Sequence, residues 1–214
     1  QIHGVVIKDK SQFRLFFSSS TGVESSAPGI VGGLTNGQEG TAWEFGLLRG
    51  IKVSCVDSGY YGSPLSEYVV HGDFAGKVFQ QEIGNSFNDE NIYAEYSTPY
   101  LDFQSPSIRK TPHRITMFAR PEGAVSLNTG ISYDWGNEEA LNPSGYAFAS
   151  TGSPTVYGTA VYGTSEYGSI SNPAMLSNVQ GSGMSMRITT STNDQSAPYT
   201  IQGLVVVYKE NGFK

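Results

Sequence analysis

Apolar and polar residues alternate at every second position through most of this 214-residue chain, and no other feature limits its fold as strongly. In one long run the alternate positions carry Val125, Leu127, Thr129, Ile131 and Tyr133. Side chains of a strand point to opposite faces in turn, so this spacing predicts a strand with one buried face. No stretch of ten residues has the sustained i, i+3, i+4, i+7 apolar spacing of an amphipathic helix. The sequence therefore predicts an all-β protein built from antiparallel sheets.

Composition and turn residues agree with this fold class. Gly occurs 26 times and Tyr 13 times, whereas charged residues make up only 15% of the chain, a balance that favours strands and tight turns over helices. The clearest hairpin covers residues 68–82, where Gly72 and Asp73 open the bend and Gly76 closes it. Residues 4–17 repeat this shape. The repeat predicts propeller-like blades in the first half.

A second domain is expected after a short polar stretch that contains Pro106 and Pro112. We place the boundary there, with a propeller-like β-sheet region over residues 1–104 and a β-sandwich over residues 105–214. The sandwich is predicted because strand-like runs in the second half are separated by turn residues about every ten positions. One such run places Ile115, Met117 and Ala119 on a single face, opposite Arg114, Thr116, Phe118 and Arg120.

The closing segment, Asn178 to Tyr208, contains two alternating runs joined by the polar bend 191–198. Met184, Met186 and Ile188 share one face of the first run, and Pro198 begins the second, where its missing N–H costs least. The pattern predicts a structural hairpin without catalytic residues.

The only cysteine, Cys55, cannot form an internal disulfide, and its alternation with Ile51 and Val53 predicts a buried position. No apolar run approaches the length that spans a bilayer. The sequence begins at Gln1, directly in a predicted strand and without an initiating Met. From this we expect a processed product or a fragment of a longer protein.

Charge is distributed unevenly between the two halves. Residues 1–104 carry 6 Lys+Arg against 12 Asp+Glu, and residues 105–214 carry 7 against 7. A protein that grips phosphate needs a basic face, and neither half offers one. The pattern argues against stable nucleic-acid binding and is compatible with a surface that nucleic acid passes without adhering.

Acidic residues that could form a catalytic pair occur mostly in turn or polar-loop contexts, where Asp caps its own bend. The candidates for a pair of glycosidase acids are Asp57, Asp73, Asp89, Glu90, Asp102, Asp134, Glu138 and Glu139. Oxygen ligands for calcium could come from Asp134, Asn137 and Glu138, but these residues lack the spacing of a calcium loop. We interpret these acids as solvated turn residues.

Other catalytic patterns are missing from the sequence. His3, His71 and His113 lie far apart and are accompanied by no cysteine cluster, and there is no G-x-S-x-G motif. The glycine-rich segment 31–40 lacks the Lys of a phosphate loop and is predicted to be an ordinary loop. We therefore predict no catalytic, cofactor-binding or metal-binding residues and no enzymatic activity.

Several tyrosines are candidates for surface contacts, namely Tyr60, Tyr61, Tyr157, Tyr162 and Tyr167. They could stack on sugars or fill a subunit interface, where Tyr is enriched. We favour the interface. The last three recur every five residues within a Gly-, Ser- and Tyr-rich stretch that we expect to be an extended surface segment.

A family resemblance rests on several of these segments together. They are KSQFRLFF, VGGL, WEFGLLRGIKVSCVDSGYYG, EYVVHGDFAGKVFQQE, IYAEYSTPYLDF, ISYDWGNEEALNPSGYAF and the closing segment with VQGSG before one strand and PYTIQG before the last. The chain resembles the C-terminal part of the tail nozzle proteins of short-tailed bacteriophages, also called tail tubular protein B. The closing pattern is the most specific part of this resemblance, which spans most of the chain.

The resemblance implies a structural role in the virion. Nozzle proteins of this family form a ring of six copies beneath the adaptor ring, contain β-rich domains including a propeller, and conduct the genome during ejection. We therefore expect a homo-oligomer, most simply a hexameric ring, in contact with other tail proteins such as the adaptor and fibres. Genomic DNA would pass without specific binding, repelled by first-half acids such as Asp57, Asp73 and Glu82.

Two functions from other classes stay open at this point. A carbohydrate-binding or receptor-binding tail module would use the tyrosine-rich segment 151–168 as its contact surface. A tail-borne glycosidase would need two of the acids named above within about 10 Å in one groove.

Overall fold

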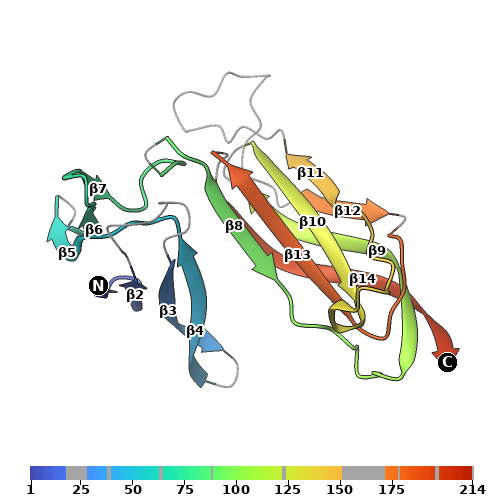
Figure 1. Cartoon of the computed structure of the whole chain (residues 1–214). Coiled ribbons are helices and arrows are strands. Elements are labelled where there is room, and N and C mark those ends of the chain that lie inside the picture. Colours follow the sequence, from blue (N-terminus) through green and yellow to red (C-terminus); the bar gives the residue numbers. More distant parts are fainter. Residues whose placement is uncertain are drawn as a thin grey trace, which may run out of the picture. The chain divides into compact units, whose positions relative to one another are not determined.

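Among the residues that the computed structural model describes, every regular element is a β-strand apart from one 3-10 turn, η2 (Asp134–Gly136). The model describes residues 1–17, 28–37, 40–62, 65–87, 89–121, 124–150, 172–177, 179–195 and 198–213. All strand pairs are antiparallel, which confirms the all-β, antiparallel prediction. The chain divides into two compact units, Gln1–Glu90 and Asn91–Lys214 (Figure 1).

The first unit contains two sheets, each formed by strands that pair in chain order. The four-stranded sheet consists of β1 (His3–Ile7), β2 (Gln12–Phe16), β3 (Pro28–Gly37) and β4 (Gly40–Arg49). The three-stranded sheet consists of β5 (Cys55–Tyr61), β6 (Ser66–Gly72) and β7 (Val78–Gln80).

The hairpin predicted over residues 68–82 is confirmed. Strands β6 and β7 pair through Gly72 and Val78. Between them, Asp73 Oδ1 accepts hydrogen bonds from the N–H groups of Ala75 and Lys77, both at 2.8 Å. Gly76 has φ +83°, a left-handed conformation that a side chain would strain. The β1–β2 hairpin is present as well.

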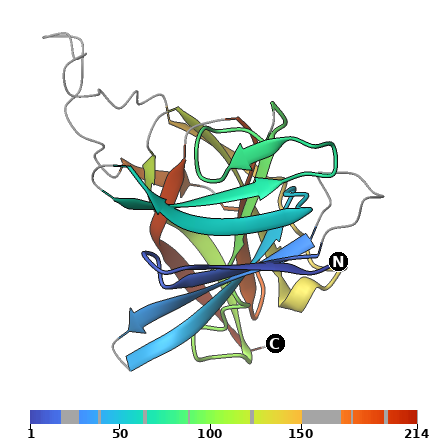
Figure 2. The same cartoon turned by 90° about the vertical axis from the view of Figure 1, so that its left-hand side faces the viewer.

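In the glycine-rich segment predicted to be a loop, residues 31–37 belong to strand β3 and residue 40 begins strand β4. Strands β3 and β4 pair from Pro28↔Arg49 to Gly37↔Gly40, and they run side by side as the two lighter blue strands of Figure 2. Glycine has no side chain and adopts extended and turn conformations about equally well, so the glycine content of this segment could not distinguish a strand from a loop.

The inner faces of the two sheets build the core of the first unit. Val5 and Ile7 of β1, Phe16 of β2 and Val69 of β6 are buried in one cluster together with Val53. Leu48, Ile51 and Val56 pack against this cluster. Because the alternate side chains of each strand point away from this core, each sheet also has an outer face.

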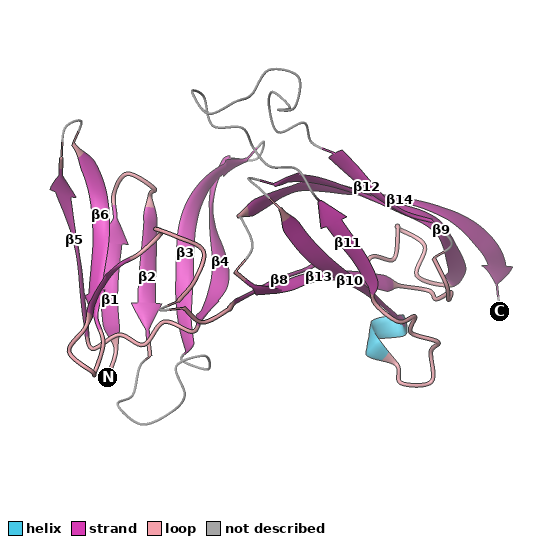
Figure 3. Cartoon of the chain, turned by 90° about the horizontal axis from the view of Figure 1, so that it is seen from above, coloured by secondary structure: helices cyan, strands magenta, loops and turns pink. Residues whose placement is uncertain are grey.

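The second unit contains two further sheets. In chain order its strands are β8 (Ile92–Ser97), β9 (Ile108–Pro121), β10 (Val125–Tyr133), β11 (Tyr146–Ser150), β12 (Asn172–Ser177), β13 (Met186–Asp194) and β14 (Tyr199–Phe213). One sheet has the order β11-β10-β13-β8 and the other the order β12-β9-β14. Figure 3 shows them as two layers.

Strand β8 belongs to the second unit because it pairs with β13 from Thr189↔Ser97 to Asp194↔Ile92. The two units therefore divide after Glu90, earlier than the boundary after residue 104 that the prolines suggested. The stretch around Pro106 and Pro112 leads into β9 of the same unit. Long-range strand pairing, which the local sequence does not encode, decides the division.

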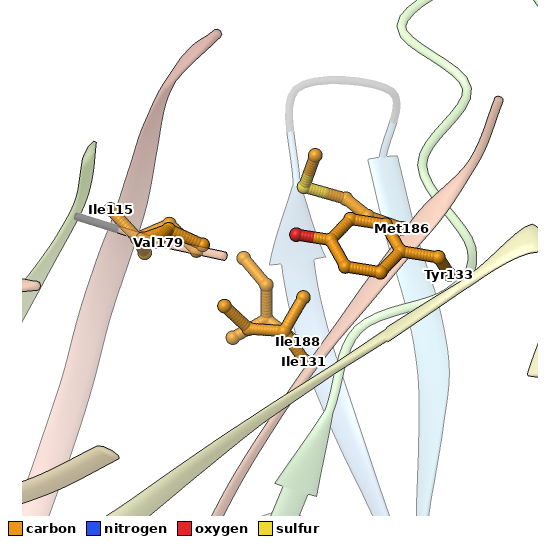
Figure 4. Close-up of a cluster of buried hydrophobic side chains, with 6 residues drawn as sticks. All are labelled: Ile115, Ile131, Tyr133, Val179, Met186 and Ile188. Atoms are coloured by element: carbon orange, nitrogen blue, oxygen red, sulfur yellow. The ribbon is translucent and has the colours of Figure 1, made fainter. Parts of the chain in front are cut away.

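The core of the second unit receives side chains from both of its sheets. Ile131 and Tyr133 of β10 and Met186 and Ile188 of β13 meet Ile115 of β9, and Val179 completes the cluster (Figure 4). The predicted faces are confirmed here, since the buried residues include Ile115, Met117, Ala119, Val125, Leu127, Thr129, Ile131 and Tyr133.

The predicted closing hairpin is wrong. Strand β13 pairs with β10 and β8, whereas β14 pairs with β9 in the other sheet. The bend near Pro198 therefore carries the chain from one layer to the other. Both strands turn one face toward the core, buried in β13 and partly buried in β14. Alternation does not say whether two consecutive strands share a sheet or face each other across a core.

Candidate interaction surface

The outer face of the four-stranded sheet is apolar across all four strands. Residues directly opposite each other in neighbouring strands lie on the same face. One row across the sheet is Val6, Phe13, Gly32 and Phe45, and the next is Gly4, Leu15, Ile30 and Leu47. Leu34 and Trp43 pair in a third row. We call this surface the β1–β4 face, defined by Val6, Phe13, Leu15, Ile30, Leu34, Trp43, Phe45 and Leu47.

Three aromatic rings occupy the centre of the β1–β4 face. Phe13 lies 5.5 Å from Trp43 and 6.2 Å from Phe45 between ring centroids, and Trp43 and Phe45 stack at 6.5 Å. Trp43 is 51% exposed, Phe45 68% and Leu47 74%. A large contiguous apolar patch of this kind on a folded unit marks an interaction site.

Glycine at position 32 allows the aromatic rings to cross the sheet. Gly32 lies between Phe13 and Phe45 in the pairing register, and a Cβ atom at Gly32 would collide with the Phe13 ring. The Phe13 ring therefore covers the backbone of β3 and reaches the side chains of β4.

The outer face of the three-stranded sheet carries an apolar cluster next to the polar side chains of Asp57, Ser66 and Gln80. Tyr61, Tyr68, Val70 and Val78 share it, as the register of β5, β6 and β7 requires. Tyr61 and Tyr68 form an edge-to-face pair at 6.5 Å, and Tyr61 and Val78 are 79% and 76% exposed. We call this surface the β5–β7 face.

A polar network joins the inner sides of the two sheets. Arg14 NH1 donates a hydrogen bond to Gln81 Oε1 at 2.7 Å, and its NH2 group pairs with Glu82, which also pairs with Lys10. Gln81 Nε2 lies 3.3 Å from His71 Nδ1. The network links the two sheets on their inner sides, so the two outer faces lie on opposite sides of one pair of layers.

Two groups in this network have shifted pKa values. Burial lowers the pKa of His71, although the negative charge of Asp73 opposes this shift. Burial alone would raise the pKa of Glu82, but hydrogen bonds from Lys10 and Arg14 and their positive charges lower it. Both groups are held in this network by their hydrogen-bond and ion-pair partners.

The acids proposed for a glycosidase pair serve backbone turns where the structure shows their contacts. Asp73 caps the β6–β7 bend, and Asp102 Oδ1 accepts from Gln104 N–H at 2.9 Å. Asp57 is exposed on the β5–β7 face. Among the described residues, no three His, Cys, Asp or Glu side chains gather as a metal site would require.

The oxygens considered for calcium are engaged within the second unit. Asp134 Oδ1 accepts a hydrogen bond from Met184 N–H at 2.6 Å, and Asn137 Oδ1 accepts one from Glu139 N–H at 3.0 Å. Both residues thus fix the backbone beside η2.

His3 is partly exposed, at 3.3 Å from Gln1 Oε1, and His113 is exposed on β9.

Cys55 is exposed, so its predicted burial is wrong. Val53 is buried in the core of the first unit, but β5 begins only at Cys55, and the alternation of Ile51, Val53 and Cys55 does not run through one strand. Cys55 pairs with Gly72 in the register, which places it on the β5–β7 face.

The tyrosine-rich segment 151–168, with Tyr157, Tyr162 and Tyr167, lies outside the described residues.

The charge difference between the two parts of the chain is smaller for the units as the structure divides them. Residues 1–90 carry 6 Lys+Arg against 10 Asp+Glu, a net charge of −4, and residues 91–214 carry 7 against 9, a net charge of −2. The acidic character is therefore shared between the units.

The described part of the chain contains no helix with the length and hydrophobicity needed to cross a membrane.

The apolar faces could not be assigned from the sequence alone. The run Trp43-Glu44-Phe45-Gly46-Leu47 alternates, which predicts that Trp43, Phe45 and Leu47 share a face and favours burial of that face. The structure buries Leu48 of the opposite face against the core of the unit instead.

No protein-family model matches the chain, and no curated protein sequence matches it significantly.

Proposed function

We propose that this protein is a structural subunit of a bacteriophage tail, a nozzle component that forms part of an axial ring through which DNA is ejected. The family resemblance of the sequence suggested this role, and the β1–β4 face is the single observation that supports it best. A monomer that works alone has no use for an apolar face of this extent, whereas a ring subunit needs rigid side surfaces to contact its neighbours. The ring would most simply contain six copies.

The finer architecture belongs to the same proposal. The two sheets of the first unit are meanders that pack face to face, as neighbouring blades of a propeller do. The two sheets of the second unit enclose a common core and exchange strands through the bends before β10 and β14, as the sheets of a β-sandwich do. We infer a propeller-like first unit and a sandwich-like second unit on these grounds.

A carbohydrate-binding or receptor-binding tail module is the second candidate, because exposed aromatic rings also stack on sugars. The surroundings of the rings favour a protein partner. Trp43 and Phe45 lie beside Leu34, Leu47 and Phe13, whereas a sugar site places a few polar groups next to its aromatic rings to bind hydroxyls. The contacts of the acids described above favour a structural role over a catalytic one.

Electron cryomicroscopy of particles that carry this chain tests the proposed function. We expect density for the chain in an axial ring of the tail, with DNA passing through it and no bound cofactor. Density only in peripheral fibres or spikes would contradict the nozzle role and favour the receptor-binding candidate.

A further inference from the structure

The first unit exposes apolar surface on both of its outer sides. The β1–β4 face is on one side of its pair of sheets and the β5–β7 face on the other, while the inner faces are joined by the core and by the Arg14 network. The apolar surface on each outer side of this pair of sheets is therefore left without a further layer to cover it. Each outer side has the chemical character needed to cover the opposite outer side of a second molecule.

We propose that the β1–β4 face of one copy of this chain packs on the β5–β7 face of a second copy, head to tail. This inference rests on the proposed role as a ring subunit and names the surfaces that would form the ring. The chain already packs these two sheets face to face through their inner sides, around Val5, Phe16 and Val69. The contact between copies would repeat that packing through the outer sides.

The exposed apolar area supplies a large part of what such a contact needs. An aromatic side chain offers about 150–250 Å², and one half to three quarters of Trp43, Phe45 and Leu47 is exposed. With Val6 and Leu34, which are 61% and 41% exposed, the β1–β4 face presents on the order of 500 Å² of apolar surface, a large part of the roughly 800 Å² that each partner contributes to a stable interface.

The two faces are complementary in charge and in shape. Each carries one charged residue among its strand positions, Arg49 on the β1–β4 face and Asp57 on the β5–β7 face. Gly59, opposite Tyr68 in the register, leaves open space above the backbone of β5. An open position of this kind accommodates a protruding ring, and opposite charges at a contact fix its register.

A contact between two different faces is heterologous, so it repeats from copy to copy. Such contacts produce a closed ring when the rotation per copy divides a full turn, and an open filament when it does not. The second copy is a better occupant than a sugar, because the β1–β4 face has only one charged side chain and an apolar centre.

The single cysteine provides a direct test, since Cys55 lies on the β5–β7 face and is exposed in the separate chain. Maleimide labelling of Cys55 is measured on the full chain over a range of concentrations, in parallel with its mass by analytical ultracentrifugation. Where oligomers form, we expect labelling to slow by more than about tenfold as mass action fills the contact. Leu47→Glu should keep the chain monomeric and Cys55 rapidly labelled.

Ala42→Glu is the matched control, because position 42 is exposed on the same strand but points to the opposite face. It should assemble and protect Cys55 as the unaltered chain does. A Leu47→Cys variant should in addition form a disulfide between copies with Cys55, and an Ala42→Cys variant should not.

Three other outcomes would overturn the inference. Oligomers in which Cys55 stays rapidly labelled, and which Leu47→Glu does not disrupt, would exclude these faces while leaving the axial-ring role to be decided by particle imaging. Protection of Cys55 that is independent of concentration would assign the faces to a contact within one chain. A monomer whose Cys55 is protected by an added oligosaccharide would assign them to sugar binding.

Discussion

Lys110 is fully buried in the second unit, and its replacement tests how the loops of that unit are held. Its relative exposure is 0%, and its ammonium group donates to three backbone carbonyl oxygens, those of Ser105, Ile108 at 2.9 Å and Met184 at 3.1 Å. An ammonium group has three donors, so each one is used. Asp134 Oδ1 accepts a hydrogen bond from the N–H of Met184 at 2.6 Å, so Lys110 binds the carbonyl group and Asp134 the N–H group of the same residue.

Lys110→Met keeps most of the side-chain volume and removes all three donors. A hydrogen bond from a charged group contributes about 1.5–3 kcal/mol net, and a buried carbonyl left unpaired costs about 1–3 kcal/mol. Removal of the buried charge returns part of its desolvation cost. We therefore expect a loss of about 3 kcal/mol in the free energy of unfolding, which corresponds to roughly 12 °C in melting temperature for a unit of this size.

The two tryptophans make the assay specific, because Trp43 lies in the first unit and Trp135 in the second. In a Trp43→Phe background, urea unfolding followed by Trp135 fluorescence reports the second unit. Lys209→Met, at an exposed position of β14, is the control and should change the free energy of unfolding by less than about 0.5 kcal/mol. If Lys110→Met unfolds at the same urea concentration as Lys209→Met, the three carbonyl contacts do not stabilise this unit.

Four further substitutions have expected outcomes. Thr129 Oγ1 is buried without a hydrogen-bond partner within the described residues, so Thr129→Val should stabilise the second unit by about 1 kcal/mol in urea unfolding. Thr98 Oγ1 accepts a hydrogen bond from Ile188 N–H at 3.1 Å, so Thr98→Val should instead destabilise the unit by about 1 kcal/mol. If both substitutions changed the free energy of unfolding in the same direction and by the same amount, the assignment would be refuted. Tyr133→Phe should cost about 1 kcal/mol, since the hydroxyl donates to Gln180 O at 2.9 Å, and a Tyr133→Phe melting temperature equal to that of the unaltered chain would contradict this. The folded pKa of His71 is lowered below its usual 6.5, so the unfolded chain binds the proton first and the stability of the first unit should fall as pH drops below about 6.5. His71→Gln should remove this part of the pH dependence, measured by thermal unfolding of the first unit between pH 7.5 and 5, roughly the range in which histidine titrates.

The sequence predicted well those features that depend on neighbouring residues. The alternation from Val125 to Tyr133 identified a strand and its buried face, because burial on one side of a strand imposes a two-residue period. The bend between β6 and β7 was predicted because Asp73 and Gly76 have the turn chemistry that the structure uses.

Features that depend on distant residues were not predictable in the same way. Strands β13 and β14 each turn the expected face toward the core. Each nevertheless pairs with strands far away in the sequence, and the short bend between them gave no sign of a change of layer. Similarly, the alternation around Trp43 identified the shared face but not its exposure. Whether an apolar face is buried within a unit depends on the number of layers available to cover it, and the first unit has only two sheets.

The contacts of individual acids also change the expectation that first-half acids repel passing DNA. Asp73 is engaged with the backbone of a bend and Glu82 with Lys10 and Arg14, so charge reversal at either residue would alter folding before it altered any contact with DNA. Asp57 lies on the β5–β7 face, which the proposed contact between copies would cover. Replacement of Asp57 by Lys would place two positive charges together at Arg49 of the next copy and weaken assembly. A salt-dependent ejection defect in such a variant would therefore arise from the ring contact, because the altered side chain would face a protein neighbour and not the DNA.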